Sequence, residues 1–126
     1  MHTPHSGFFD EIATELFFEL ISKYNYVLSE KRSSPLSVKH IYLNTSINRR
    51  IEISNETHGY DYGFSFFIYN ILSAEYNILY NVPNEHQDPD CKFLIKVQND
   101  LFTTKDTLDL IAGHDWKQHK HIIFQL

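Results

Sequence analysis

The sequence predicts an α+β protein in which an N-terminal amphipathic helix packs on an antiparallel β-sheet of about five strands, followed by one or two further C-terminal helices. Two observations carry this prediction. Apolar residues recur about every four positions over residues 8–24, as they do on one face of a helix. The chain then changes to short β-rich segments separated by polar turns. At a length of 126 residues, positions 1–126 are expected to form a single domain.

The N-terminal helix is the clearest element of the sequence. Its apolar stripe covers residues 8–24, and Ser6 stands where a capping side chain is expected. Asp10 and Glu11 follow near its start, where carboxylates meet the positive end of the helix dipole. The opposite face is polar except at Phe18. We therefore expect either an unusually wide buried arc or one aromatic side chain that is partly exposed.

The middle of the chain predicts a meander of antiparallel strands, because segments of alternating polarity follow one another across polar turns. The pair Thr45-Ser46 is typical of the tight turn of a hairpin. In the arm that follows, Ile51 and Ile53 alternate with polar side chains, so one face of this part of the sheet is expected to be wet. The strands are expected at residues 26–30, 38–44, 47–54, 63–70 and 76–82, and an acidic loop at residues 83–90.

Two of these strands differ in their pattern. Residues 63–70 are apolar on both faces, which is typical of a central strand covered on both sides. Residues 76–82 alternate regularly. Tyr76 and Tyr80 are therefore expected to share one face of the sheet, with Leu79 on the other.

The last third of the chain fits more than one structure. Residues 92–102 alternate as a strand would, but their apolar side chains also recur at helical spacing, and the helix is favoured. Thr104 is placed to start a second short helix that ends at Gly113. Residues 120–126 are expected to form a strand or a docked extension.

Charge and composition exclude several classes of function. The net charge is −5 and the basic residues are dispersed, so no basic stripe is available for nucleic acid. The start of the chain has no leader-like apolar stretch, and no run of apolar residues is long enough to span a membrane. We therefore predict a cytoplasmic protein that binds neither nucleic acid nor membranes. The single cysteine, Cys91, cannot form an intrachain disulfide.

A cluster of histidines near the C-terminus is the feature most suggestive of chemistry. If the tail is extended, His119 and His121 share one face and can chelate a borderline metal together, with His114 joining from the preceding turn. The alternative is a solvated histidine-rich tail. These three histidines are the candidate metal ligands, and no other cofactor is predicted.

A tyrosine-rich segment between two predicted strands is the candidate for protein binding. Tyr60 and Tyr62 flank Asp61 at the expected tip of a loop. Tyrosines presented in this way bury a large area at a small entropic cost, which suits an interface. The alternative is that both rings fold back over the sheet.

The sequence gives little support for an enzyme. Pro89-Asp90 and the triplet 115–117 match a loose pattern of metal-dependent nucleases, but a predicted helix separates them and no basic surface is available for phosphates. Cys91 has no base next to it in the sequence, and neither a serine nucleophile elbow nor a glycine-rich phosphate loop is present.

Two classes of function follow from these patterns. The first is a small acidic cytoplasmic protein-binding module, with a basic protein as its partner and a homodimer as its own state. Its size, charge and α+β composition are similar to those of bacterial toxin-neutralising immunity proteins, although no residue motif carries that resemblance. The alternative is a metal-binding or small-molecule-binding protein that uses the C-terminal histidines, with hydrolase activity as one use of such a site.

Overall fold

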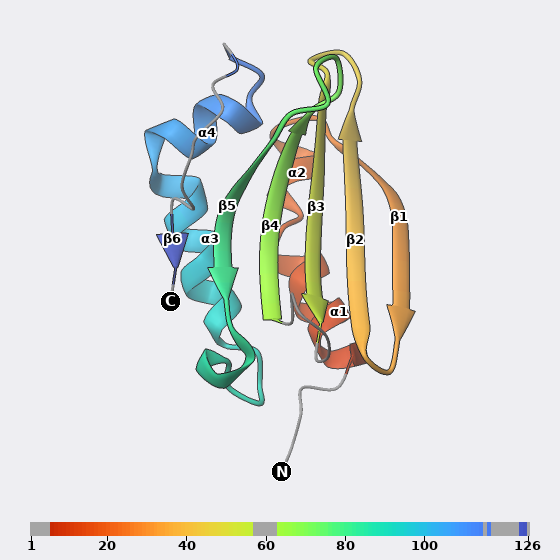
Figure 1. The fold of residues 1–126 in the computed structure, drawn as a ribbon, viewed down its shortest axis with the longest axis vertical. Coiled ribbons are helices and arrows are strands. Elements are labelled where there is room, and N and C mark those ends of the chain that lie inside the picture. The colour runs from red at the N-terminus through yellow and green to blue at the C-terminus, as the bar shows by residue number, and fades with distance from the viewer. Residues whose placement is uncertain (1–5, 57–62, 115, 117–123, 126) are drawn as a thin grey trace.

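The computed structural model describes residues 6–56, 63–114, 116 and 124–125. It shows the predicted α+β fold, in which an antiparallel sheet carries a layer of helices (Figure 1). The helices are α1 (Ser6–Leu16), α2 (Glu19–Ser22), α3 (Phe93–Thr103) and α4 (Lys105–Ile111), with a 3-10 turn at Asn84–His86. The strands are β1 (Val27–Ser34), β2 (Ser37–Asn44), β3 (Arg49–Glu56), β4 (Gly63–Asn70), β5 (Tyr76–Val82) and β6 (Phe124–Gln125).

The strands follow one another across the sheet in chain order, β1-β2-β3-β4-β5-β6. Strands β1 to β5 are antiparallel, which confirms the predicted meander, and the short β6 runs parallel to β5 at its outer edge. In Figure 1 the strands β1 to β4 lie in front of α1 and α2. One face of the sheet therefore packs on helices, and none of the described helices covers the other face.

The buried core lies between the helices and the inner face of the sheet. Phe9 and Phe17 of the N-terminal segment pack against Phe64 and Phe66 of β4, with ring centroids 6.1 Å and 5.8 Å apart respectively. Tilted contacts of this kind bury large apolar areas and fix the position of the helix on the sheet. The largest fully buried side chains are Phe9, Phe17, Leu20, Tyr26, Tyr42, Ile51, Ile53, Phe64, Phe66, Ile68, Leu79 and Tyr80.

The N-terminal helix is present in two pieces rather than one. The amide of Leu20 donates to the carbonyl of Phe17 at 3.0 Å, a shorter-range bond than the α-helical pattern, and the chain tightens at this point. This break keeps Phe17 and Leu20 directed into the core and leaves Phe18 54% exposed. Ser6 is the first residue of α1 rather than its cap, so Asp10 lies beyond the first turn.

The β2–β3 hairpin has a longer turn than predicted. Four residues, 45–48, connect the two strands, and the amide of Asn48 donates to the carbonyl of Thr45 at 3.3 Å. Asn48 has a φ of 58°, a left-handed conformation that asparagine tolerates better than most residues. Ile47 therefore belongs to the turn and not to the strand.

A β-bulge in β5 overturns the predicted alternation of that strand. The pairing of β5 with β4 shifts by one residue at Leu79, which has no partner of its own in β4. As a result Tyr80 faces the helices and is buried, whereas Tyr76 lies on the opposite face of the sheet. The same bulge buries Leu79 on the helix side, where regular alternation would have directed it outward.

The C-terminal segment forms the helix that the sequence favours. Both carboxylate oxygens of Asp88 accept hydrogen bonds from the first amides of this segment, those of Lys92 and Phe93, at 2.8 Å. Asp88 in the acidic loop thus serves as a cap for α3. Helix α4 follows directly, and Gly113 ends it with a φ of 87°. Among the described residues, no helix combines the length and apolar character needed to cross a membrane.

Candidate functional site

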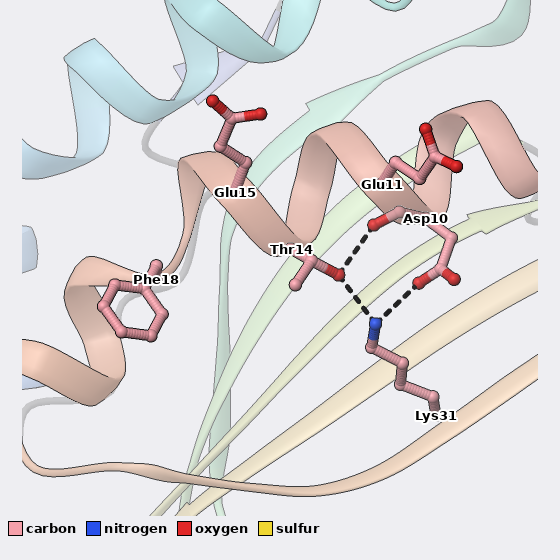
Figure 2. Close-up of a pocket in the computed structure, with 6 residues that line it drawn as sticks. All are labelled: Asp10, Glu11, Thr14, Glu15, Phe18 and Lys31. Carbon is pink, nitrogen blue, oxygen red and sulfur yellow. Dashed lines mark hydrogen bonds and ion pairs between the residues drawn. The ribbon is translucent and has the colours of Figure 1, made fainter.

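The described surface includes an open hollow of about 470 Å³ between the outer side of α1 and strand β1 (Figure 2). We call it the α1 site. Helical spacing explains its composition, because residues three or four positions apart come to lie next to one another on a helix. It is lined by Asp10, Glu11, Thr14, Glu15, Phe18 and Lys31.

Lys31 fastens this side of the helix to the sheet. Its Nζ atom donates to Oγ1 of Thr14 at 2.8 Å and lies 3.1 Å from Oδ1 of Asp10. The hydroxyl of Thr14 in turn donates to the backbone carbonyl of Asp10 at 2.7 Å. These contacts hold one wall of the α1 site in a single geometry.

Beneath this wall lies a buried histidine. The side chain of His40 is 0% exposed, and its Nε2 atom lies 2.7 Å from Oδ1 of Asp10. Burial lowers the pKa of His40, and the positive charge of Lys31 acts in the same direction, while Asp10 opposes both. Nδ1 of His40 is buried without a hydrogen-bond partner among the described residues. A neutral ring that carries its proton on Nε2 fits this arrangement, because only an acceptor is then left unpaired.

Asp10 stays ionised in this environment. Burial acts to raise its pKa, but the hydrogen bonds from Lys31 and His40 outweigh that effect and lower it. The carboxylate of Asp10 is therefore shared between a lysine and a neutral histidine, both of which contact its Oδ1 atom.

The free acidic groups lie on the other side of the helix. Figure 2 shows the carboxylates of Glu11 and Glu15 directed away from Lys31. Among the described residues no ion pair reaches either of them. The exposed ring of Phe18, three residues after Glu15, lines the same hollow. This part of the site combines free negative charge with an accessible aromatic face.

The Asp10–His40 pair resembles part of a catalytic triad, but its geometry does not support catalysis. The imidazole of His40 is fully buried, so it cannot reach a substrate in the hollow. Burial, together with the charges of Asp88 and Asp90, raises the pKa of the Cys91 thiol to about 11, which leaves it a poor nucleophile. The arrangement of the described residues favours binding over reaction.

Acidification should weaken the fold through His40. The pKa of His40 is lower in the folded state than in the unfolded chain, so the unfolded state takes up the proton first as the pH falls. The contribution of His40 to the free energy of unfolding is therefore fully present above about pH 6.5 and is lost as the pH falls below that value. Between pH 7 and about pH 5.5 this single group can account for a loss of at most about 1 kcal/mol.

Urea unfolding at both pH values should show a smaller drop in the free energy of unfolding for His40→Gln than for the parent, because glutamine keeps a donor toward Asp10 and does not titrate. The exposed His86→Gln serves as the control and should retain the full drop. An equal drop in His40→Gln and the parent would contradict this assignment.

The residues singled out from the sequence fall mainly elsewhere. His114 is exposed just after α4, and its backbone carbonyl accepts a hydrogen bond from Nη2 of Arg49 at 2.6 Å. His119 and His121 lie outside the described residues, and so does the segment Tyr60, Asp61, Tyr62. Among the described residues, no three histidine, cysteine, aspartate or glutamate side chains gather as metal ligands would. The metal hypothesis and the tyrosine-loop hypothesis both stay predictions.

Sequence reasoning missed the α1 site for a clear reason. Asp10 and Glu11 could be interpreted as partners of the helix dipole. Lys31 and His40 come from two strands, and the packing of these strands against α1 leaves no local signal in the sequence. The only available signal was Phe18, the aromatic residue on the polar face of the helix.

Searches against protein-family models, curated proteins and solved structures find no match to this chain.

Proposed function

We propose that this chain is a small acidic protein-binding module of the cytoplasm that holds a basic segment of a partner protein at the α1 site. The observation that carries the proposal is that the exposed ring of Phe18 and the unpaired carboxylates of Glu11 and Glu15 line the same open hollow. Aromatic and acidic groups presented together suit a lysine or arginine side chain whose neighbours are apolar.

The chemistry of such a partner follows from these groups. A guanidinium or ammonium group can stack on the face of Phe18 and pair with Glu15 at the same time. Exposed ion pairs contribute little each, so most of the affinity must come from apolar contact with the ring of Phe18. The net charge of −5 adds long-range attraction for a basic partner and speeds their encounter at low salt.

The wall formed by Lys31, Thr14 and Asp10 supports this use of the site. These three side chains are already bonded to one another, so binding does not have to order them. A preformed wall lowers the entropic cost of association. The break between α1 and α2 leaves the ring of Phe18 exposed at the end of that wall.

Binding of a basic amphipathic peptide tests the proposal. The probe is a fluorescein-labelled hexapeptide of alternating arginine and leucine, titrated with the full chain at low salt and followed by anisotropy. Glu15→Lys should weaken binding by about tenfold, because it replaces attraction by repulsion at the site. Phe18→Ser should weaken it as well, with the salt dependence left nearly as in the parent.

The matched control is Asp106→Lys, the same change of net charge on the exposed side of α4. This variant should bind the peptide within about twofold of the parent. If Glu15→Lys and Asp106→Lys weaken binding equally, the peptide responds to net charge alone and the α1 site is not the binding surface.

A further inference from the structure

The face of the sheet opposite the helices carries an ordered pattern of side chains. We call it the open face. Strand pairing arranges its residues in rows that cross the sheet, and the two rows nearest the β4–β5 turn contain all the aromatic and aliphatic residues of these rows. The first row is Val27, Leu43, Arg50, Tyr69 and Tyr76, and the second is Glu30, Ile41, Glu52, Phe67 and Ile78. The two remaining rows are polar: Arg32, Lys39, Ser54, Ser65 and Asn81, then Ser34, Ser37, Glu56 and Gly63.

Three aromatic rings gather at one end of the open face. The ring centroids of Tyr69 and Tyr76 are 5.5 Å apart, and Phe67 lies 6.3 Å from the former and 6.0 Å from the latter. Tyr76 is 46% exposed, and Leu72 in the adjoining turn is 78% exposed. The bulge at Leu79 is what brings Tyr76 to this face. Exposed apolar groups gathered in one place are typical of a contact surface.

The charged side chains of the open face are held in place around these rings. Arg50 donates through Nη2 to Oε1 of Glu52 at 2.5 Å, and its guanidinium lies 5.2 Å from the centre of the Tyr69 ring. Arg32 pairs with Glu30 in the same way near the opposite edge of the sheet. The Arg50–Glu52 pair is already formed within one chain, so association does not have to order it.

The charge of the open face differs from that of the molecule as a whole. Its rows contain as many acidic as basic residues, so its formal charge is zero, whereas the chain carries −5. The excess negative charge therefore lies away from this face. Two copies that meet through their open faces avoid the like-charge repulsion that other surfaces would bring. A face with both signs is compatible with a two-fold contact in which acidic groups of one copy meet basic groups of the other. The charged residues are Glu30, Glu52 and Glu56 against Arg32, Lys39 and Arg50.

We propose that the open face binds a second copy of this chain in a symmetric dimer, with the rings of Phe67, Tyr69 and Tyr76 at the centre of the contact. The edges of the sheet are less suited to association. Strand β1 carries the charged run Glu30, Lys31, Arg32 and a break in register at Ser29, features that discourage strand addition. The outer edge of β5 already pairs with β6.

Sedimentation equilibrium of the full chain from about 5 μM to about 500 μM tests the dimer. The parent should be dimeric over most of this range, and Tyr76→Ser should weaken the dimer at least about tenfold, because the removed ring lies at the centre of the contact. Leu72→Ser, in the exposed turn, provides a second variant with little risk to folding and should weaken it in the same direction. Circular dichroism melts confirm that each variant is folded.

The control is Phe18→Ser, which removes a comparably exposed ring from the helix side of the molecule. This variant should remain as dimeric as the parent. A parent that stays monomeric to the highest concentration would overturn the proposal, as would a dimer that survives both Tyr76→Ser and Leu72→Ser. A dimer lost in Phe18→Ser alone would place the contact at the α1 site instead.

Discussion

Replacing Phe17 by alanine should lower the free energy of unfolding by about 3–5 kcal/mol, which is a large share of the stability of a domain of this size. The ring of Phe17 is 0% exposed and packs 5.8 Å from that of Phe66 in the sheet and 6.3 Å from that of Phe102 in α3. Its removal leaves a cavity at the point where helix, sheet and C-terminal helix meet. Urea denaturation followed by circular dichroism measures the change.

The neighbouring residue supplies a matched control. Phe18→Ala removes the same side chain one position along, from a ring that is 54% exposed, and should change the stability by no more than about 0.5 kcal/mol. The contrast depends on the break between α1 and α2, which decides which of the two rings enters the core. Similar losses for both variants would mean that the break does not separate them in this way.

Replacing Arg49 by methionine should cost about 2–4 kcal/mol, because it leaves buried carbonyl groups without donors. Nε of Arg49 donates to the carbonyl of Leu110 at 3.0 Å, and its guanidinium lies 5.0 Å from the centre of the Trp116 ring. The hydroxyl of Tyr26 donates to the carbonyl of Ile111 at 2.7 Å. Together these donors bind the end of α4 to the sheet. The free energy of unfolding in urea measures the loss, and fluorescence of Trp116, the only tryptophan in the chain, reports the local change.

Two further substitutions separate charge from hydrogen bonding at this position. Arg49→Lys keeps the positive charge but lacks the planar fork that serves several carbonyls at once, so its stability should fall between those of the parent and Arg49→Met. Arg32→Met, an arginine on the open face, should cost clearly less, because both its side chain and that of its partner Glu30 are exposed. A loss below about 1 kcal/mol in Arg49→Met would show that α4 is held by other contacts.

The fold was largely predictable because its signals are local. Helical spacing over the N-terminal stripe and the polar turns between strands each involve residues close in sequence. The departures occur where distant contacts decide. Phe17 and Phe18 are identical residues, and only the position of the sheet determines which one is buried. Leu79 forms a bulge because β4 and the helices beneath it fix the pairing, a constraint that the regular alternation of residues 76–82 does not reveal.

The candidate site was much less predictable than the fold. Asp10, Lys31 and His40 come from α1, β1 and β2, and only the packing of the helix on the sheet brings them together. The sequence favoured histidines 114–121 and the tyrosines at 60–62 instead, because residues of one kind crowd together there along the chain. A cluster of residues that are close along the chain is visible in a sequence. A cluster of residues that come from separate helices and strands is not.

The strand order also sets how the molecule can assemble itself during folding. Every pairing from β1 to β5 joins strands that are neighbours in the chain, so each hairpin closes only a short loop and can form before the rest of the sheet. The pairing of β5 with β6 is different, because the whole of α3 and α4 lies between those strands. That contact requires the closure of a long loop. The entropic cost of this closure is offset only once the packing of both helices has brought the two strands close together. We therefore expect the sheet to form from its own hairpins and the pairing of β6 with β5 to form last.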